Sequence, residues 1–392
     1  MSLPNIKFNI SSNGLGLLQS DIQKIPGFVL TGATVAGSNK VTVATSYQIF
    51  SLEEAVNLGI EETGTNAFAY SHIKSFYDEA KKGAELWFML VISTVTLEDQ
   101  ADLTKNFAKK LLSDAQGKIR ILGLLKKSGV GEVITNGLDN DVHLAVVKAQ
   151  ALAQDFSDRY FPVRVLISGN KFDGVVANLK DYSTTDYNKV SILIANNDAS
   201  KEASIGLALG RLASIPTQRK ISRVKDGAIE PFAAYFTNGE PVSTLDTAWD
   251  AIDTKNYTFL RSFANLSGFF FTGDKTLTAS TDDFNSLARG LVMDEAILIA
   301  YTTLVQELSD EIPVTTTGTI HAVIIKGWQN AIERQIKGLM VEEGKLSGVK
   351  AFIDENQDVL VTNNVDIQLQ LLPVGYSDFI TVNIGFTTTL DE

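Results

Sequence analysis

The spacing of apolar residues predicts that the first part of the chain is an α/β region. Between Gly27 and about Ile229, continuous apolar runs alternate with segments whose apolar residues recur at helical spacing. Strands are predicted over 86–94, 119–125, 163–168 and 190–195, and helices over 97–112, 141–160 and 203–214. Strands that are apolar on both faces and separated by helices are typical of a mostly parallel sheet with helices on both sides.

From about Pro241 the pattern changes to an α+β arrangement. Aromatic and β-branched residues predict two strands, over 257–263 and 269–271. Asp282 or Asp283 is then expected to cap a long helix of about 25 residues, because a carboxylate can accept the free N–H groups of the first turn. A second helix is predicted around 328–339, and the alternating tail predicts two final strands, around 365–371 and 380–386.

Both ends of the chain are predicted to be half-buried strands. The alternating apolar positions are Ile6, Phe8 and Ile10 at the start and Ile380, Val382 and Ile384 near the finish. A strand at a chain end presents unpaired N–H and C=O groups, and the final strand carries no charged residue to protect that edge. These strands are expected to pair with another copy of the chain, as in strand addition, or within their own chain; the residues alone leave both open.

Composition narrows the class of protein. A chain of 392 residues with 44% hydrophobic and 20% charged residues is expected to fold into two domains or three. The formal charge of −12 argues against nucleic-acid binding, and the absence of cysteine excludes disulfides, thiol nucleophiles and Cys-ligated zinc. The apolar runs are far shorter than the roughly 18 to 20 residues of a membrane span, and no secretory signal is seen, so we expect the chain to fold in a cytoplasm.

Candidate catalytic chemistry is sparse. His72, His143 and His321 are the three histidines, and they lie on different predicted elements, which gives neither a triad nor a histidine metal site. Paired acids fall at expected helix starts, helix faces or turns, where capping or solvation accounts for them. We therefore predict no catalytic residue, no metal and no cofactor.

One segment supports an alternative, a GTPase-like nucleotide-binding α/β enzyme. Asn170, Lys171 and Asp173 match the N-K-x-D pattern that reads guanine, directly after a predicted strand. The nearest candidate for a phosphate loop, 32–40, has two residues between its last glycine and Lys40, which displaces the lysine from the helix start. Residues 114–117 fit D-x-x-G but end a helix. A polar turn after the strand is the simpler interpretation of 170–174.

The stretch 257–308 resembles the late part of contractile phage-tail sheath proteins of the Mu-like and prophage types. Their pattern "G-x-F-F-x-x-D-K-T-L-T" leads into a long helix that carries "R-x-x-V-x-D-E/K-A". The matching residues are Arg261, Gly268, Phe270, Phe271, the run 274–278, Asp282, Asp283, Arg289, Val292, Asp294 and Ala296. A second run, 206–224, is similar to the family's "G-x-x-L-G-R-x-A-x-I-P".

This resemblance implies a fold and a domain order. It implies a mostly parallel α/β outer domain over 21–240, inserted into an α+β core domain. That core would be built from an N-terminal strand arm over 1–20 and from 241–392, and its terminal strands would be exchanged between subunits.

The resemblance also implies a function without bond chemistry. The chain would be a sheath subunit in a phage, prophage or tail-like injection device, and no enzyme. It would polymerise around a tail tube and contract by rigid-body rearrangement. Its partners would be other copies, the tail tube protein and the baseplate, with no nucleic acid and no membrane insertion. It would be assembled in a bacterial host cytoplasm and would lie in the virion tail.

Eight residues are candidates for contacts between subunits. They are Ile6, Phe8, Ile10, Ile380, Val382, Ile384, Arg289 and Asp294. The last two match the pattern of the family's long helix. They stand five positions apart, so they do not face each other as an i,i+4 pair, and each is expected to find a partner elsewhere.

Overall fold

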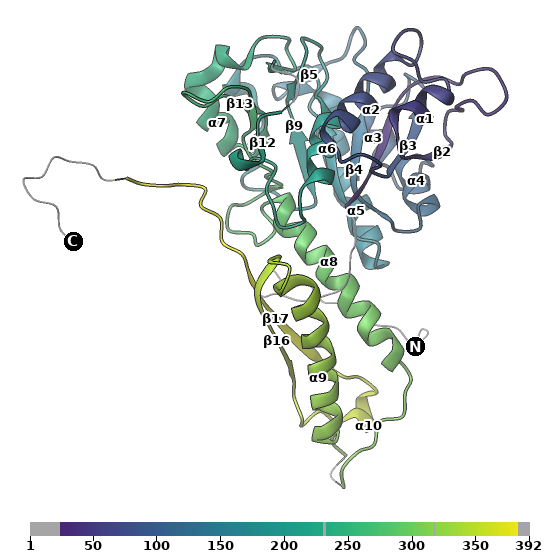
Figure 1. Cartoon of the computed structure of the whole chain (residues 1–392), viewed down its shortest axis with the longest axis vertical. Coiled ribbons are helices and arrows are strands. Elements are labelled where there is room, and N and C mark those ends of the chain that lie inside the picture. The colour runs from purple at the N-terminus through teal and green to yellow at the C-terminus, as the bar shows by residue number, and fades with distance from the viewer. Residues whose placement is uncertain (1–23, 230–232, 317, 383–392) are drawn as a thin grey trace, which may run out of the picture.

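The computed structural model of the chain describes residues 24–229, 233–316 and 318–382. Figure 1 shows a larger α/β part, from which the long helix α8 descends to a smaller part made of a hairpin and a second helix. The architecture is therefore mixed α/β, with one helix running from one part into the other.

A seven-stranded sheet organises the larger part, in the order β12-β9-β7-β4-β1-β3-β2. All neighbouring strands in it are parallel except the edge strand β2, which is antiparallel to β3. Its strands are β1 Ile25–Thr31, β2 Ser46–Ile49, β3 Leu86–Val91, β4 Ile119–Leu125, β7 Arg164–Ser168, β9 Val190–Leu193 and β12 Tyr257–Thr258. The predicted mostly parallel sheet is confirmed.

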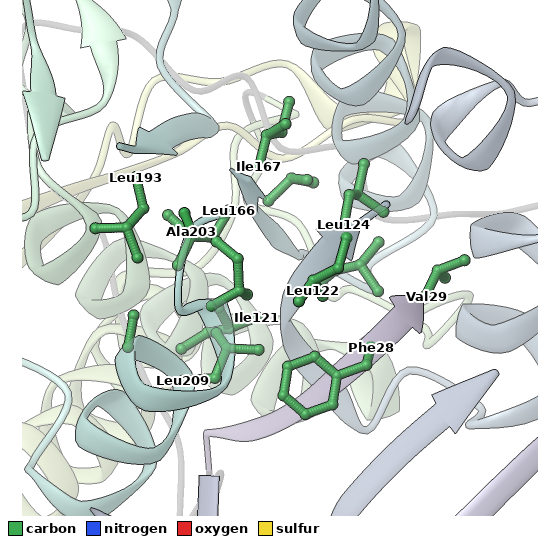
Figure 2. Packing of buried hydrophobic residues seen from close by; sticks show 14 of the residues in the cluster. Phe28, Val29, Ile121, Leu122, Leu124, Leu166, Ile167, Leu193, Ala203 and Leu209 are labelled. Atoms are coloured by element: carbon green, nitrogen blue, oxygen red, sulfur yellow. The ribbon is translucent and has the colours of Figure 1, made fainter. Parts of the chain in front are cut away.

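Both faces of this sheet are covered. Successive residues of a strand point to opposite faces, and in β7 and β9 every residue is buried. The helices of this part are α1 Leu52–Asn57, α2 Ala67–Glu79, α3 Leu97–Ala101, α4 Ala108–Asp114, α5 Asn140–Asp158, α6 Ile205–Ser214 and α7 Trp249–Thr254. Figure 2 shows aliphatic and aromatic side chains from four strands and from α6 meeting in this core.

Helices α2 and α6 touch through their backbones. A Cβ atom added to Gly206 would lie 2.0 Å from the carbonyl oxygen of His72, and one on Gly210 would lie 2.5 Å from that of Phe76. Next to this contact, Arg211 donates a 2.8 Å hydrogen bond to buried Glu79. The run 206–216 is thus a helix-packing device, and its glycines are required by the close approach.

The smaller part contains a two-stranded antiparallel hairpin. Its elements are α8 Leu287–Leu304, α9 Ala322–Ile336 followed by a π-helical turn over Lys337–Val341, β16 Leu346–Ile353, α10 Val359–Thr362 and β17 Ile367–Pro373. One face of the hairpin packs through Leu346 and Leu371 on Ala296, Ile332 and Ile336 of the two long helices. Within the described residues, β16 pairs with β17 alone.

Several element boundaries differ from the prediction. Helix α8 has 18 residues and begins after Ser286, whose Oγ accepts a hydrogen bond from the N–H of Arg289. Asp282, one of the two predicted caps, instead accepts the N–H of Phe284 within the preceding turn. The predicted helix over 97–112 is divided into α3 and α4, because the carboxylate of Asp102 binds the N–H of Thr104 and turns the chain.

The predicted strand over 257–263 is also divided. Strand β12 completes the large sheet, although it lies beyond residue 240, where the outer domain was expected to end. Strand β13 Leu260–Arg261 pairs instead with β14 Phe270–Phe271. A strand was predicted from residue 380 onwards, and 380–382 form none within the chain.

Candidate interaction surfaces

A buried ion pair joins the α/β part to helix α8. Arg164, the first residue of β7, binds both carboxylate oxygens of Asp294 at 2.6 Å, and both side chains are almost fully buried. The guanidinium also donates to the carbonyl oxygens of Asn188 and Gly290, at 3.0 and 3.1 Å. A Cβ on Gly290 would lie 2.6 Å from the guanidinium carbon, so glycine is needed here. Asp294, a candidate for contacts between subunits, therefore has a partner within its own chain.

The run 274–278 fixes the start of α8. Buried Asp274 accepts the N–H of Leu287 on its carbonyl oxygen at 2.8 Å and the N–H of Ala288 on its carboxylate at 2.9 Å. The hydroxyl of Thr276 donates to the carbonyl oxygen of Phe284 at 2.6 Å. Burial raises the pKa of Asp274, and the charge of Lys220 and the hydrogen bond from the N–H of Ala288 partly offset that rise. The residues that carry the resemblance thus build the joint between the two parts.

Three further ionisable groups lie near this joint. Glu295 on α8 accepts a 2.6 Å hydrogen bond from Lys345, which precedes β16, and so ties the helix to the hairpin. Burial raises the pKa of Glu295, and the bond from Lys345 opposes that rise. Burial lowers the pKa of Lys189 to about 8, and the neighbouring charge of Arg164 acts in the same direction.

The hairpin borders a groove with an open strand edge. The groove, of about 990 Å³, lies between β16 and the helix α9 with its π-helical turn. Its lining includes Gly327, Ala331, Glu333, Lys337, Gly338 and Val349. An unpaired strand edge beside a groove is the arrangement by which proteins accept an additional strand.

The C-terminal segment is attached to the α/β part after it leaves β17. The hydroxyl of Tyr376 donates to the carbonyl oxygen of Gln218 at 2.6 Å, and Lys220 binds Asp378 at 2.7 Å while lying 4.6 Å from the centre of the Tyr376 ring. Burial raises the pKa of Tyr376 to about 12. Beyond this attachment the side chains of Phe379, Ile380 and Val382 are 95%, 79% and 74% exposed. Figure 1 shows the segment extending away from the rest of the molecule.

The predicted contact residues are placed as follows. Ile380 and Val382 are exposed on the departing segment, whereas Ile6, Phe8, Ile10 and Ile384 lie outside the described residues. Arg289 is half-buried near the start of α8, and among the described residues its guanidinium has no ion pair. Among the four described members of this set, no hydrogen bond or ion pair joins Arg289 or Asp294 to Ile380 or Val382.

The residues of the nucleotide-binding alternative are used internally. The side chain of Asn170 accepts from Ser168 and donates to the carbonyl oxygen of Lys126. Asp173 accepts from the N–H of Val175, and the ammonium of Lys171 binds the carbonyl oxygen of Gly129 at 2.7 Å. These side chains are therefore not directed at a base, which argues against guanine recognition.

The loop after β4 is also satisfied by the protein itself. This loop lies at the carboxyl end of the strand, where α/β proteins bind phosphates. Its amides at Ser128 and Gly129 donate to the carboxylates of Glu202 and Glu132, which occupy the place of an anion. Across 24–229, 233–316 and 318–382 the structure holds no cluster of three metal-ligating side chains, and no helix is long and apolar enough to cross a membrane.

Two protein-family models match most of this chain. The model of the DUF2586 N-terminal domain matches residues 3–275, and that of the DUF2586 C-terminal domain matches residues 283–391. The chain belongs to the DUF2586 family. No curated protein matches this family member.

Solved structures show the fold that this DUF2586 chain shares. The contracted helical sheath of the anti-feeding prophage is 14% identical, with a TM-score of 0.65 over 99% of this chain and 100% of that one. The contracted PVC sheath complex of an extracellular contractile injection system is 14% identical, with a TM-score of 0.59 over 99% and 98%. A chain of the six-fold symmetrised anti-feeding prophage baseplate is 12% identical, with a TM-score of 0.63 over 99% of this chain and 100% of that one. The described chain therefore has the fold of these sheath and baseplate proteins.

Two residues were not identified from the sequence: Arg164 in the joint with α8 and Tyr376 in the attachment of the C-terminal segment. Arg164 was a detectable signal, because it stands as a lone charge in the apolar run 163–168, and a charge buried in a strand requires a partner. Tyr376 gave no such signal, since a tyrosine in a turn is common and its partner Gln218 is remote in the sequence.

Proposed function

We propose that this chain is the structural subunit of a contractile sheath, in a phage tail, a prophage or a tail-like injection device. The observation that carries the proposal is the match of the whole chain to sheath subunits of two injection systems. Side chains of the alternative site are used internally, which supports a role without bond chemistry.

Polymerisation would proceed by strand addition to the hairpin. Its edges are unpaired within the described chain, and the segment after Asp378 exposes large apolar side chains. The N-terminal strand with Ile6, Phe8 and Ile10 and the C-terminal strand with Ile380, Val382 and Ile384 would add to hairpins of neighbouring copies. Each added strand makes about four or five main-chain hydrogen bonds, worth a net ~0.5–1.5 kcal/mol apiece. A head-to-tail contact of this kind produces a helical polymer when the rotation between successive copies does not close a ring.

Contraction would move subunits as nearly rigid bodies. The buried Arg164–Asp294 pair and the capping of α8 by Asp274 support this, because both hold the α/β part firmly on the helix that leads to the hairpin. In the assembly we place the α/β part, which includes β12, outward, and the smaller part, together with the N-terminal arm 1–20, towards the tail tube. The terminal arms would act as hinges, and the difference in free energy between two packings would drive the tube. The tube protein and the baseplate would be its other partners in the tail.

Electron microscopy of the purified chain tests this proposal. The full chain is concentrated with and without tail tube protein, beside one variant that lacks residues 1–12 and another that lacks 379–392. Hollow cylinders from the full chain that are lost in both truncated variants are the expected result. Dispersed particles from the full chain under every condition, tube protein included, would overturn the sheath function.

A further inference from the structure

A carboxylate of the same chain is hydrogen-bonded to the edge of β16 that does not pair with β17. The N–H of Ala351 donates a 2.8 Å hydrogen bond to Oε1 of Glu333, which stands on α9. The ammonium of Lys350 lies 3.2 Å from the same oxygen. An acidic side chain thus reaches from the helix to the backbone of the strand and holds one of its donors.

The direction of this donor identifies the edge. Neighbouring residues of an antiparallel strand send their N–H and C=O groups to opposite sides. The N–H of Ala351 is directed at α9 and away from β17, so the groups of Val349 and Ile353 are directed the same way. These three residues form the edge to which a further strand would bond, and Glu333 binds its central N–H.

The space beside this edge suits a strand. The groove is lined by Gly348, Val349 and Lys350 of β16, next to Ala351. On the helix side a Cβ on Gly327 or Gly338 would meet no atom within 4 Å. A displaced Glu333 carboxylate also has another partner, because Lys337 stands four residues further along the helix and lines the same groove. The carboxylate can therefore leave Ala351 without being left as an isolated charge.

We propose that Glu333 is an assembly lock, which a strand of a second copy displaces when it pairs with β16. The inference rests on the proposed sheath function and deepens it. The lock raises the protein concentration at which the chain polymerises, because each added strand must first break the bond between Glu333 and Ala351. When the incoming strand pairs with β16, the carboxylate of Glu333 leaves Ala351 and pairs with Lys337.

The incoming strand is the C-terminal segment of the second copy. Residues 379–390 carry no charge, and those at 379, 380 and 382 are exposed apolar side chains in the isolated chain. The groove holds two acids, Glu333 and Glu342, against three bases, Arg334, Lys337 and Lys350. An uncharged strand fits this excess of positive charge better than the N-terminal strand, which would add Lys7.

A sedimentation experiment with the full chain tests the lock. The concentration at which half of the protein pellets is measured for the wild type, Glu333→Ala and Glu333→Gln, with Glu342→Ala as control. The control removes a negative charge from the same groove without touching Ala351. We expect Glu333→Ala to lower that concentration about three- to tenfold, Glu333→Gln less, and Glu342→Ala not at all. Equal shifts for Glu333→Ala and Glu342→Ala, or a higher concentration for Glu333→Ala, would overturn the lock.

Amide exchange of the unassembled chain provides a second readout. The N–H of Ala351 should exchange several-fold faster in Glu333→Ala than in the wild type. Its exchange rate should be unchanged in Glu342→Ala. If Glu333→Ala fails to fold, Glu333→Gln carries the test. Failure of the lock and failure of the sheath function remain distinguishable. Polymers that form with equal ease in all variants sink only the lock, whereas the absence of polymers in every variant sinks the function.

Cross-linking identifies the incoming strand. The chain has no cysteine, so each introduced pair is unambiguous. In an added strand whose Ile380 and Val382 face α9, the alternate residues Thr381 and Asn383 point to the opposite face of the sheet. Phe352 of β16 is exposed on that face. A Phe352→Cys chain is mixed with Thr381→Cys or Asn383→Cys, and separately with Lys7→Cys or Asn9→Cys, and oxidised after assembly. Disulfides need Cα atoms within about 7 Å. Bonds to 381 or 383 are expected; bonds to 7 or 9 alone would overturn the choice of the C-terminal segment.

Discussion

Arg164 and Asp294 are 130 positions apart in the chain and meet through two hydrogen bonds of 2.6 Å in the interior of the protein. One residue begins a strand of the large sheet and the other lies on α8, so the pair fixes the helix against the sheet. A buried guanidinium is tolerated only where its charge and its donors are satisfied, and here a carboxylate and two carbonyl oxygens satisfy them.

Removal of one member of this pair should be costly. Asp294→Ala leaves a buried unpaired guanidinium and is expected to lower the free energy of unfolding by about 3–5 kcal/mol. The double variant Arg164→Met with Asp294→Leu should recover most of that loss, because no buried charge remains. Urea denaturation measures both. Asp78→Ala, which breaks the exposed pair with Lys74, should change stability by less than about 1 kcal/mol. A double variant as unstable as the single one would refute this explanation.

The contact between α2 and α6 makes a second prediction. Gly206→Ala places a methyl group 2.0 Å from a backbone oxygen, so the helices must separate, and stability should fall by about 2–3 kcal/mol. Gly327→Ala is the matched control, because it also lies inside a helix but has open space beside it. It should raise stability by about 0.5–1 kcal/mol through helix propensity. Thermal and urea unfolding of both variants measure the contrast, and a similar loss in both would contradict it.

His72 should make the stability of the chain depend on pH. Burial lowers its pKa to about 4 from an ordinary value of 6.5. Between these values the unfolded chain binds a proton that the folded chain does not, so stability falls as the pH decreases from about 6.5 to 4. The total loss from this group is about 3 kcal/mol.

The pH test compares wild type with His72→Gln. Unfolding free energies are measured by urea at intervals from pH 7 to 4.5, and the difference between the two proteins should narrow as the pH falls. Carboxylates contribute to both curves alike and cancel in the difference. Parallel curves would show that His72 does not titrate as its burial requires.

The attachment of the C-terminal segment can be probed with a protease. Tyr376→Phe removes the bond to Gln218, and Lys220→Ala removes the bond to Asp378, so the segment should detach more often. Chymotrypsin cleavage after Phe379 is expected to accelerate several-fold in each variant. Lys127→Ala, distant from this contact, serves as the control and should leave the rate unchanged.

Much of the fold could be predicted from periodicity. Strand β4 occupies the predicted residues 119–125, because a run that is apolar on both faces has few alternatives inside a covered parallel sheet. The start of α8 could not be predicted in the same way. Asp282, Asp283 and Ser286 are all good capping residues, and Asp274, which is remote along the chain, selects among them by binding the N–H groups of 287 and 288.

Less of the candidate site could be predicted. Alternation indicates the apolar terminal segments, yet an isolated chain does not reveal which edge they join. Glu333 looks like an ordinary solvated acid on a helix, and its significance arises only from the position of the β16 edge beside it. Sequence patterns describe which side chains prefer burial, whereas contacts between remote elements decide which backbone groups remain available.

The joint between β7 and α8 also affects how such a chain can vary among relatives. The two DUF2586 models divide the chain between residues 275 and 283, but Arg164 lies on one side of that division and Asp294 on the other. A chimera that takes only one side from a distant relative would put a foreign residue opposite a buried charge. We therefore expect the two named domains to be inherited together, with changes at one member of the pair compensated at the other.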